Sequence, residues 1–120
     1  MNAVVSLSPH NVSCRLSFAE TLDLSGNDFS STLSPDIAKL TNLETLMLNE
    51  LSGLTGALPD SLMSASAMKN LQLFQTQLTA PIFDFVPSWP ELEILWLDQS
   101  HVTGSIPTTI GVTNPKLKEM

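Results

Sequence analysis

The stretch ETLDLSGNDFSSTLSPDIAKLTNLETLMLN, which runs from Glu20 to Asn49, contains nearly the same pentapeptide twice, ETLDL at its start and ETLML 24 residues later. Each copy holds two leucines separated by one residue. The same Leu-x-Leu pair returns twice more, at spacings of 25 and 24 residues. The four pairs are Leu22/Leu24, Leu46/Leu48, Leu71/Leu73 and Leu95/Leu97, and Met120 stands where a fifth would begin. The chain is therefore built from an internal repeat.

Other apolar residues recur with the same period. In each repeat, three of them follow the Leu-x-Leu pair and one precedes the next pair, so that aligned repeats show four further apolar columns. These columns are Phe29, Leu54, Leu78 and Val102; Leu33, Leu58, Ile82 and Ile106; Ile37, Leu62, Val86 and Ile110; and Leu43, Met68, Leu92 and Leu117. Random placement of apolar residues would not hold this alignment across the repeats. The sequence therefore predicts a series of structurally equivalent turns.

An isolated Leu-x-Leu strand cannot bury its apolar face, but stacked copies form a parallel sheet with strands about 4.8 Å apart. Parallel neighbours need a crossover of a dozen or more residues. The crossovers here contain several prolines, which favour turns and short 3₁₀ helices over long helices. Ser34 and Pro35 are typical of a helix start, with Ser34 as the N-cap and Pro35 in the first turn.

Two segments, LTGALP (residues 54–59) and VTGSIP (residues 102–107), resemble a motif of plant-type leucine-rich repeats, and LDLSGNDF (residues 22–29) resembles their core. In the equivalent segments, FSSTLS has lost the glycine and the proline, and LTAPIF has moved its proline. The resemblance implies an α/β fold, a right-handed leucine-rich-repeat solenoid or horseshoe. It places a parallel β-sheet on the concave face and short 3₁₀ or helical turns on the convex face. It also implies that the second short strand formed by this motif is incomplete.

For the domain organisation, we expect an irregular N-terminal turn over residues 1–19 and a leucine-rich-repeat array over residues 20–120. The array would hold about four repeats and would be truncated at its C-terminal end. Solenoids need polar caps to shield their open ends, and no C-terminal cap is recognisable in the sequence. The simplest interpretation is a fragment of a longer array.

Members of this family carry a buried asparagine after each strand, whose amide bonds backbone groups of neighbouring turns. Asn27 matches that position, but the later repeats hold Leu51 or Ser52, then Thr76, then Ser100. A hydroxyl group replaces some of these bonds with fewer donors than an amide. Because the second repeat also has one extra residue, we expect a looser second turn.

The composition excludes several partners. The chain has 12 acidic and 5 basic side chains and a net charge of −7, which argues against nucleic acid and against a polybasic membrane patch. No apolar run approaches the length of a membrane span, and no signal peptide is recognisable. The single cysteine, Cys14, permits no internal disulfide and leaves the compartment open. The resemblance implies the extracellular face of the plasma membrane.

No residues form a recognisable catalytic or metal-binding constellation. His10 and His101 lie far apart in the sequence, and His101 falls at a turn after a strand, where a solvated imidazole is expected. Cys14 fits a small buried apolar residue better than a nucleophile. We expect no enzyme activity, cofactor or metal in this chain, and any kinase activity would reside in sequence outside it.

Side chains that flank the buried leucines point outward and would tile the concave face. Several of them are large and apolar, which suggests a partner surface, and Trp is enriched among binding hot spots. The candidate ligand-binding residues are Met47, Gln72, Phe74, Ile94, Trp96 and Asp98. Alternatively, these side chains pack against flanking sequence, or single exposed apolar residues carry no function.

A charged column lies two residues before each first leucine. It contains Glu20, Glu44, Lys69 and Glu93, of which the last three alternate in sign. In a stacked sheet these side chains would be neighbours. We interpret the column as a solvated series of salt bridges, each worth about 0–1 kcal/mol, and not as a site.

The resemblance implies a protein- or peptide-recognition module, part of the ectodomain of a receptor-like protein or receptor-like kinase. Two alternatives stay open: spacer repeats without a ligand of their own, and a fragment of a protein kinase whose catalytic domain lies outside this chain. The expected partner is a protein or peptide. We expect this segment to bind no nucleic acid and to make no membrane contact. We also expect it to associate through its uncapped solenoid ends.

Overall fold

The computed structural model describes residues 2–3, 19–28, 30 and 32–120. Cys14 and His10 lie outside the described residues, as does most of the irregular turn expected over residues 1–19. Within that turn, Asn2–Ala3 forms strand β1, which pairs in parallel with the first strand of the array.

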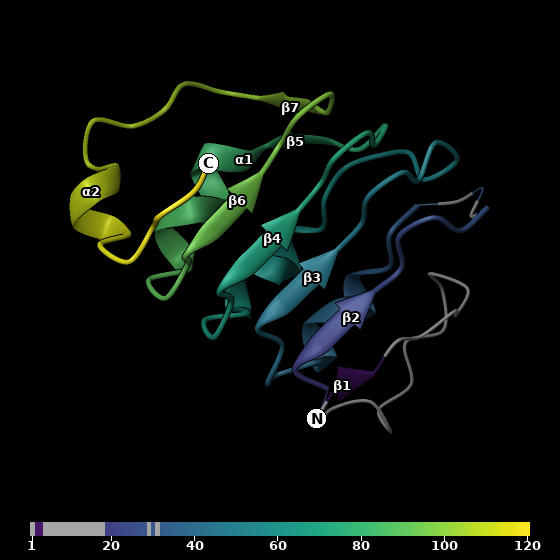
Figure 1. Cartoon of the computed structure of the whole chain (residues 1–120), viewed down its shortest axis with the longest axis horizontal. Helices are drawn as coiled ribbons and strands as arrows, with labels where there is room; N and C mark the ends of the chain where they lie inside the picture. The colour runs from purple at the N-terminus through teal and green to yellow at the C-terminus, as the bar shows by residue number, and fades with distance from the viewer. Residues whose placement is uncertain (1, 4–18, 29, 31) are drawn as a thin grey trace.

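Among the described residues, five strands form one parallel sheet in the order β1-β2-β3-β4-β6 (Figure 1). After β1 they are β2 (Thr21–Asp23), β3 (Thr45–Met47), β4 (Asn70–Gln72) and β6 (Ile94–Trp96). The register aligns the first leucine of every pair, Leu22 with Leu46, Leu71 and Leu95. The repeat length therefore sets the strand register, and the predicted leucine-rich-repeat solenoid is confirmed.

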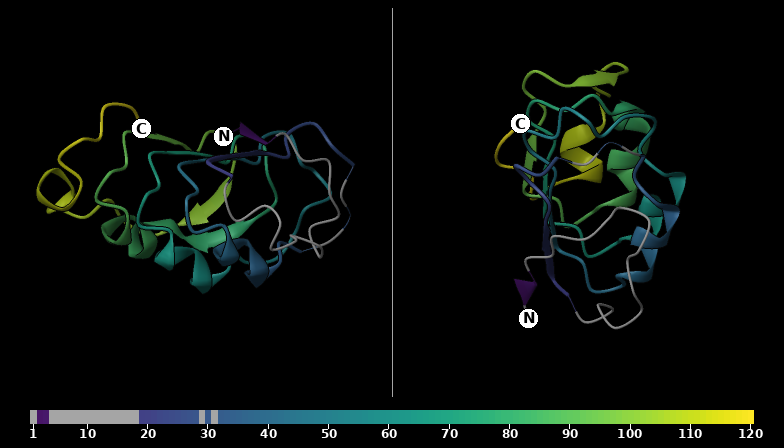
Figure 2. Two further views of the ribbon diagram at one scale, coloured as in Figure 1. Left: turned by 90° about the horizontal axis from the view of Figure 1, so that it is seen from below. Right: turned by 90° about the vertical axis from the view of Figure 1, so that its right-hand side faces the viewer.

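Short helices lie along the side of the solenoid opposite the sheet (Figure 2). In the described part of the chain they are η2 (Pro35–Lys39), η3 (Asp60–Ser64), α1 (Ile82–Phe85), η4 (Val86–Ser88) and α2 (Ile110–Thr113). Ser34 caps η2 as predicted, because its hydroxyl oxygen accepts a hydrogen bond from the backbone N–H of Asp36 at 3.2 Å, and Pro35 stands in the first turn. Proline and the short crossover length keep each helix to about one turn.

A second parallel sheet of two described strands, β5 (Thr79–Pro81) and β7 (His101–Thr103), lies beside the first. Within the described residues it continues toward the N-terminus as isolated bridges and not as strands, so this sheet is incomplete there, as expected. The missing strands do not coincide with the altered motifs, however. LTAPIF, whose proline has moved, forms β5, whereas the better preserved LTGALP forms only isolated bridges. In both preserved motifs the glycine, Gly56 or Gly104, has a left-handed backbone with φ of 86° or 103°.

The apolar columns form one continuous core between the sheet and the short helices. Seven leucines of the four pairs are at most 3 % exposed, and Leu97 in the last pair is half-buried. Trp89 lies on the helical side and is fully buried. Its indole N–H donates to the carbonyl oxygen of Leu62 at 3.1 Å, and its ring lies 6.0 Å from that of Phe85.

One position in the turn after each strand holds asparagine in the family that the sequence resembles. This chain keeps the asparagine in the first repeat and replaces it in the other three. The side-chain amide of Asn27 donates to the carbonyl oxygen of Leu24 at 2.9 Å, and the hydroxyls of Thr76 and Ser100 bond the carbonyls three residues before them. In the second repeat Leu51 occupies this position and is fully buried, whereas Ser52 is exposed. Leucine has no donor, so the second turn lacks the side-chain bond that the other three have. The looser second turn stays a prediction.

The residue before this position has a left-handed backbone in every repeat. It is Gly26, Glu50, Gln75 or Gln99, with φ of 71°, 56°, 52° and 54°. The equivalence of Glu50 with the other three places the extra residue of the second repeat after Leu51. There the backbone N–H of Leu54 closes a turn onto the carbonyl oxygen of Leu51 at 3.1 Å.

The last turn repeats the apolar sequence pattern, but its apolar side chains are less buried. Glu119 forms a bridge with Ile94, which brings Met120 level with Leu95 as predicted. Ile106 and Met120, however, are 55 % and 56 % exposed. The described chain places no further turn against them.

Candidate functional site

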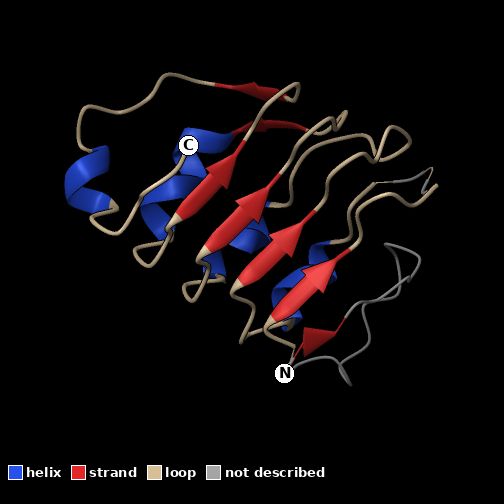
Figure 3. Ribbon diagram, viewed as in Figure 1, coloured by secondary structure: helices blue, strands red, loops and turns tan. Residues whose placement is uncertain are grey.

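The strands of the larger sheet lie side by side (Figure 3), so residues at equivalent positions form columns across the sheet. The register aligns Asp23, Met47, Gln72 and Trp96 in one column, and Thr21, Thr45, Asn70 and Ile94 in another. Because side chains alternate along a strand, these residues lie on the face opposite the leucine core. The sheet face therefore presents the side chains that the sequence predicts for it.

A hydrogen-bonded network of side chains crosses the middle of this face. The amide nitrogen of Asn49 donates to Gln72 Oε1 at 2.8 Å, and the amide nitrogen of Gln72 donates to Asn70 Oδ1 at 3.2 Å. Asn49 Oδ1 accepts from the backbone N–H of Phe74 at 2.9 Å. These bonds occupy much of the polar capacity of Gln72, which is only 9 % exposed, so the centre of the face is held by its own hydrogen bonds.

A hollow of about 620 Å³ opens beside this network, toward the C-terminal end of the array. It is lined by Asn49, Glu50, Phe74, Trp96, Asp98, Lys118, Glu119 and Met120. Trp96 is 44 % exposed, and its indole N–H donates to Glu119 Oε2 at 3.2 Å. The hollow thus combines an accessible aromatic face with several charged groups.

The structure brings together three of the six candidate residues. Phe74, Trp96 and Asp98 line the hollow, whereas Met47, Gln72 and Ile94 lie on the same face but not among its lining residues. The five lining residues outside the candidate set are Asn49, Glu50, Lys118, Glu119 and Met120. The 25-residue period could have predicted that Lys118, Glu119 and Met120 belong to this face. It places Glu119 opposite Ile94, in a further strand position.

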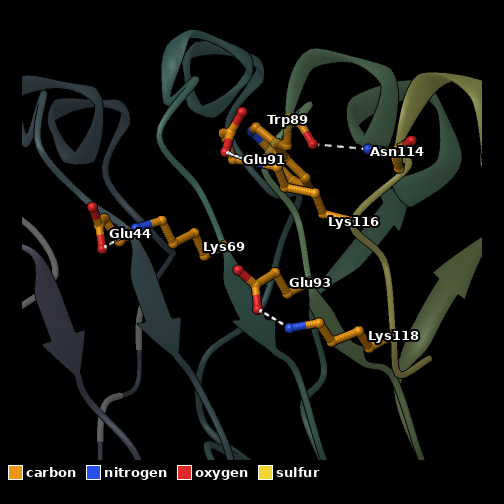
Figure 4. Close-up of polar contacts among 8 residues, drawn as sticks. All are labelled: Glu44, Lys69, Trp89, Glu91, Glu93, Asn114, Lys116 and Lys118. Atoms are coloured by element: carbon orange, nitrogen blue, oxygen red, sulfur yellow. Dashed lines mark hydrogen bonds and ion pairs between the residues drawn. The ribbon is translucent and has the colours of Figure 1, made fainter.

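The charged column lies at the entry to the strands, and ion pairs form along it (Figure 4). Lys69 contacts Glu44 at 2.9 Å, and Lys118 extends the column by contacting Glu93 at 2.9 Å. The hydrogen bond with Glu44 raises the pKa of Lys69, and the hydrogen bond from Lys118 lowers the pKa of Glu93. These exposed pairs fit the predicted series of surface salt bridges.

A second hollow of about 400 Å³ lies at the turns that follow the strands. It is lined by Glu50, Ser52, Gln75, Gln77 and Gln99. The left-handed backbone at Glu50, Gln75 and Gln99 directs these side chains to one rim, where Gln75 Nε2 donates to Gln99 Oε1 at 2.9 Å. This rim is polar and has no aromatic wall, so the first hollow is the better candidate site.

His101 is the described histidine, and its position differs from the prediction. It begins strand β7 and does not occupy a turn, although its side chain is exposed as expected. Its Nδ1 lies 3.1 Å from the carbonyl oxygen of Thr76, a contact that holds the ring at the surface. Within the described ranges, no group of three or more His, Cys, Asp or Glu side chains is arranged to hold a metal ion. No helix among the described residues is long and apolar enough to cross a membrane.

Comparisons with known proteins agree with this architecture. The sequence profile of the family described as Leucine Rich Repeat matches residues 19–40. The leucine-rich-repeat ectodomain of the receptor kinase SOBIR1 from Arabidopsis thaliana is 26 % identical over 65 % of this chain and 42 % of its own, with a TM-score of 0.59. A leucine-rich-repeat protein of Leptospira interrogans is 26 % identical over 92 % of this chain and 28 % of its own, with a TM-score of 0.69.

The crystal structure of PEPR1–AtPEP1 shares the fold at 22 % identity and a TM-score of 0.67, over 91 % of this chain and 19 % of that chain. The sequence thus spans less than half the length of each of these structures. No curated protein sequence matches the chain significantly. The stacked Leu-x-Leu strands, the profile match at residues 19–40 and these structural relatives together show a leucine-rich-repeat solenoid, whose repeats are similar to those of a plant receptor-kinase ectodomain.

Proposed function

We propose that the chain is a recognition module that binds a protein or peptide on its sheet face, at the hollow between Phe74 and Trp96. The observation that carries the proposal is the 44 % exposed Trp96 in the wall of that hollow. Large apolar side chains at a concave surface mark partner sites, and Trp supplies many of the residues that dominate binding energy. The volume of about 620 Å³ falls within the range of ordinary ligand pockets.

The structural relatives support this proposal. SOBIR1 is a receptor kinase whose ectodomain has this architecture, and PEPR1 has been solved as PEPR1–AtPEP1. We therefore favour a role within the ectodomain of a receptor-like protein or receptor-like kinase. The alternative is a spacer segment without a ligand, which is favoured by the internal pairing of Asn49 with Gln72 across the face.

Selection of displayed random peptides on the full chain, followed by calorimetric affinity measurement, tests the proposal. Trp96→Ala should weaken the selected peptides by 10-fold or more, which is the effect expected of a hot-spot residue. Ile106→Ala is the matched control, because Ile106 is also large, apolar and exposed but does not line the hollow. Circular dichroism should show the same fold for both variants.

Two results would contradict the proposal. Equal losses in Trp96→Ala and Ile106→Ala would place binding elsewhere. Failure to select any peptide whose binding depends on the hollow would favour the spacer role.

A further inference from the structure

We propose that the hollow selects a positively charged side chain of its ligand, an arginine or a lysine, which would lie against the ring of Trp96. This inference rests on the proposed function, because it names the chemistry that a peptide must bring to the same site. It draws on the charges that line the hollow and on the way in which Trp96 is held.

The lining carries more negative than positive charge. Three carboxylates, Glu50, Asp98 and Glu119, face one basic side chain, Lys118. Lys118 is already engaged outside the lining, since its Nζ contacts the carboxylate of Glu93 at 2.9 Å. Among the described residues, Glu119 accepts a hydrogen bond from Trp96, whereas Glu50 and Asp98 have neither an ion pair nor a side-chain hydrogen bond.

The aromatic wall is suited to the same class of ligand. The ring of Trp96 is held at its edge by the hydrogen bond from its indole N–H to Glu119, which leaves part of its surface exposed. A cation over an aromatic face is attracted by the ring quadrupole, and tryptophan is the strongest of the aromatic residues in this interaction. Phe74 supplies a second, half-buried ring in the same lining. An aliphatic stem with a cationic head would fill both the apolar and the charged parts of the hollow.

Other ligand chemistries fit less well. A neutral apolar side chain would bury the carboxylates of Glu50 and Asp98 without a partner, which is costly. An acidic side chain would be repelled by the same groups. Of the three classes, the cationic side chain alone gains from both the aromatic and the acidic parts of the lining.

Nuclear magnetic resonance on the ¹⁵N-labelled full chain tests the selectivity directly. The chain has two tryptophans, so it gives two indole N–H signals. The signal of Trp96 reports on the hollow, and that of buried Trp89, which is bonded to Leu62, serves as an internal reference. The probes are the capped tripeptides Gly-Arg-Gly, Gly-Leu-Gly and Gly-Glu-Gly.

We expect the arginine peptide to shift the Trp96 signal and to leave the Trp89 signal in place. Its affinity should exceed that of the leucine and glutamate peptides by about 5-fold or more. Binding should weaken in 1 M salt, where the Debye length falls to about 3 Å from about 10 Å at 0.1 M. Equal or tighter binding of the leucine peptide would overturn the inference.

A pair of double variants separates the local charges from the net charge of the protein. Glu50→Gln with Asp98→Asn should weaken the arginine peptide by about 5- to 10-fold. Asp60→Asn with Asp84→Asn removes two charges from exposed helical positions on the opposite side, at η3 and α1, and should leave its affinity unchanged. Equal losses in the two double variants would mean that only the overall charge attracts the peptide, which would overturn the inference.

The two proposals fail in different ways. If leucine or glutamate peptides shift the Trp96 signal as well as the arginine peptide does, the hollow is a recognition site without charge selectivity, and only the inference fails. If none of the three peptides moves that signal and no displayed peptide depends on Trp96, both proposals fail.

Discussion

The turn that contains β4 and the turn that follows β6 share one apolar pattern but are held together in different ways. Leu71, Leu73 and Val86 of the earlier turn are fully buried. In the later turn Ile106 is 55 % exposed, although its counterpart Ile82 in the earlier turn is fully buried, and the buried residue Asn114 is polar. The repeat pattern thus decides where each side chain stands in its turn, but burial requires a neighbouring turn on both sides.

Polar contacts take the place of apolar burial in the later turn. The amide nitrogen of Asn114 donates to the carbonyl oxygens of Val86 and Trp89 at 2.9 and 2.8 Å. Lys116 and Lys118 form ion pairs with Glu91 and Glu93 of the turn before (Figure 4). The middle of the array is therefore stabilised by packing, and its last turn by a few directed bonds.

The largest expected effect comes from breaking the packed turn. Leu73→Ala should lower the free energy of unfolding by about 2–5 kcal/mol, because it leaves a cavity in a fully buried core. Ile106→Ala, at an exposed position of the last turn, should change it by no more than about 0.5 kcal/mol. Urea unfolding of both variants measures the difference, and equal losses would show that the two turns are packed alike.

The next effect comes from the buried amide of the last turn. Asn114→Ala removes both donors and leaves the carbonyls of Val86 and Trp89 without that partner, at a cost of about 1–3 kcal/mol. Thr108→Ala, at an exposed residue of the same turn, is the control and should cost almost nothing. Hydrogen exchange should show faster opening of residues 110–117 in Asn114→Ala. Unchanged protection there would mean that Asn114 does not hold the turn.

The smallest effect concerns the pH dependence of the ion pair between Glu93 and Lys118. The hydrogen bond from Lys118 lowers the pKa of Glu93 below its usual value of 4.5, so the pair stabilises the fold above that pH. The contribution is lost as the pH falls through the depressed folded-state pKa. Lys118→Gln should flatten this acid limb slightly, and high salt should do the same in the unmodified chain. Identical urea midpoints of both proteins between pH 3 and pH 6 would contradict the prediction.

The fold was largely predictable because the leucine period constrains it strongly. Residues 24 or 25 positions apart must stack if each turn is to hide its leucines, and this placed Leu46 opposite Leu22 and Met120 opposite Leu95. The helix start at Ser34 followed from local hydrogen bonding alone. These features depend on spacing and on residue type, both of which a sequence displays.

The candidate site was less predictable because it depends on side chains from several turns. Gln72 is held in its buried position by bonds to Asn70 on its own strand and to Asn49 in the turn after the neighbouring strand. Glu50 reaches the hollow through a left-handed backbone that its residue type does not favour. The choice between Leu51 and Ser52 likewise needed the backbone of the turn. The period gives no information on such contacts.

The stacking of the strands also has a mechanical consequence. The hydrogen bonds of the sheet run along the long direction of the array, and each strand pairs only with its neighbours. A force applied to the two ends of the array therefore acts on all turns in series. Each turn that yields releases its own 24 or 25 residues, roughly 80–90 Å of extended polypeptide. Under tension this protein would lengthen in discrete steps, one turn at a time.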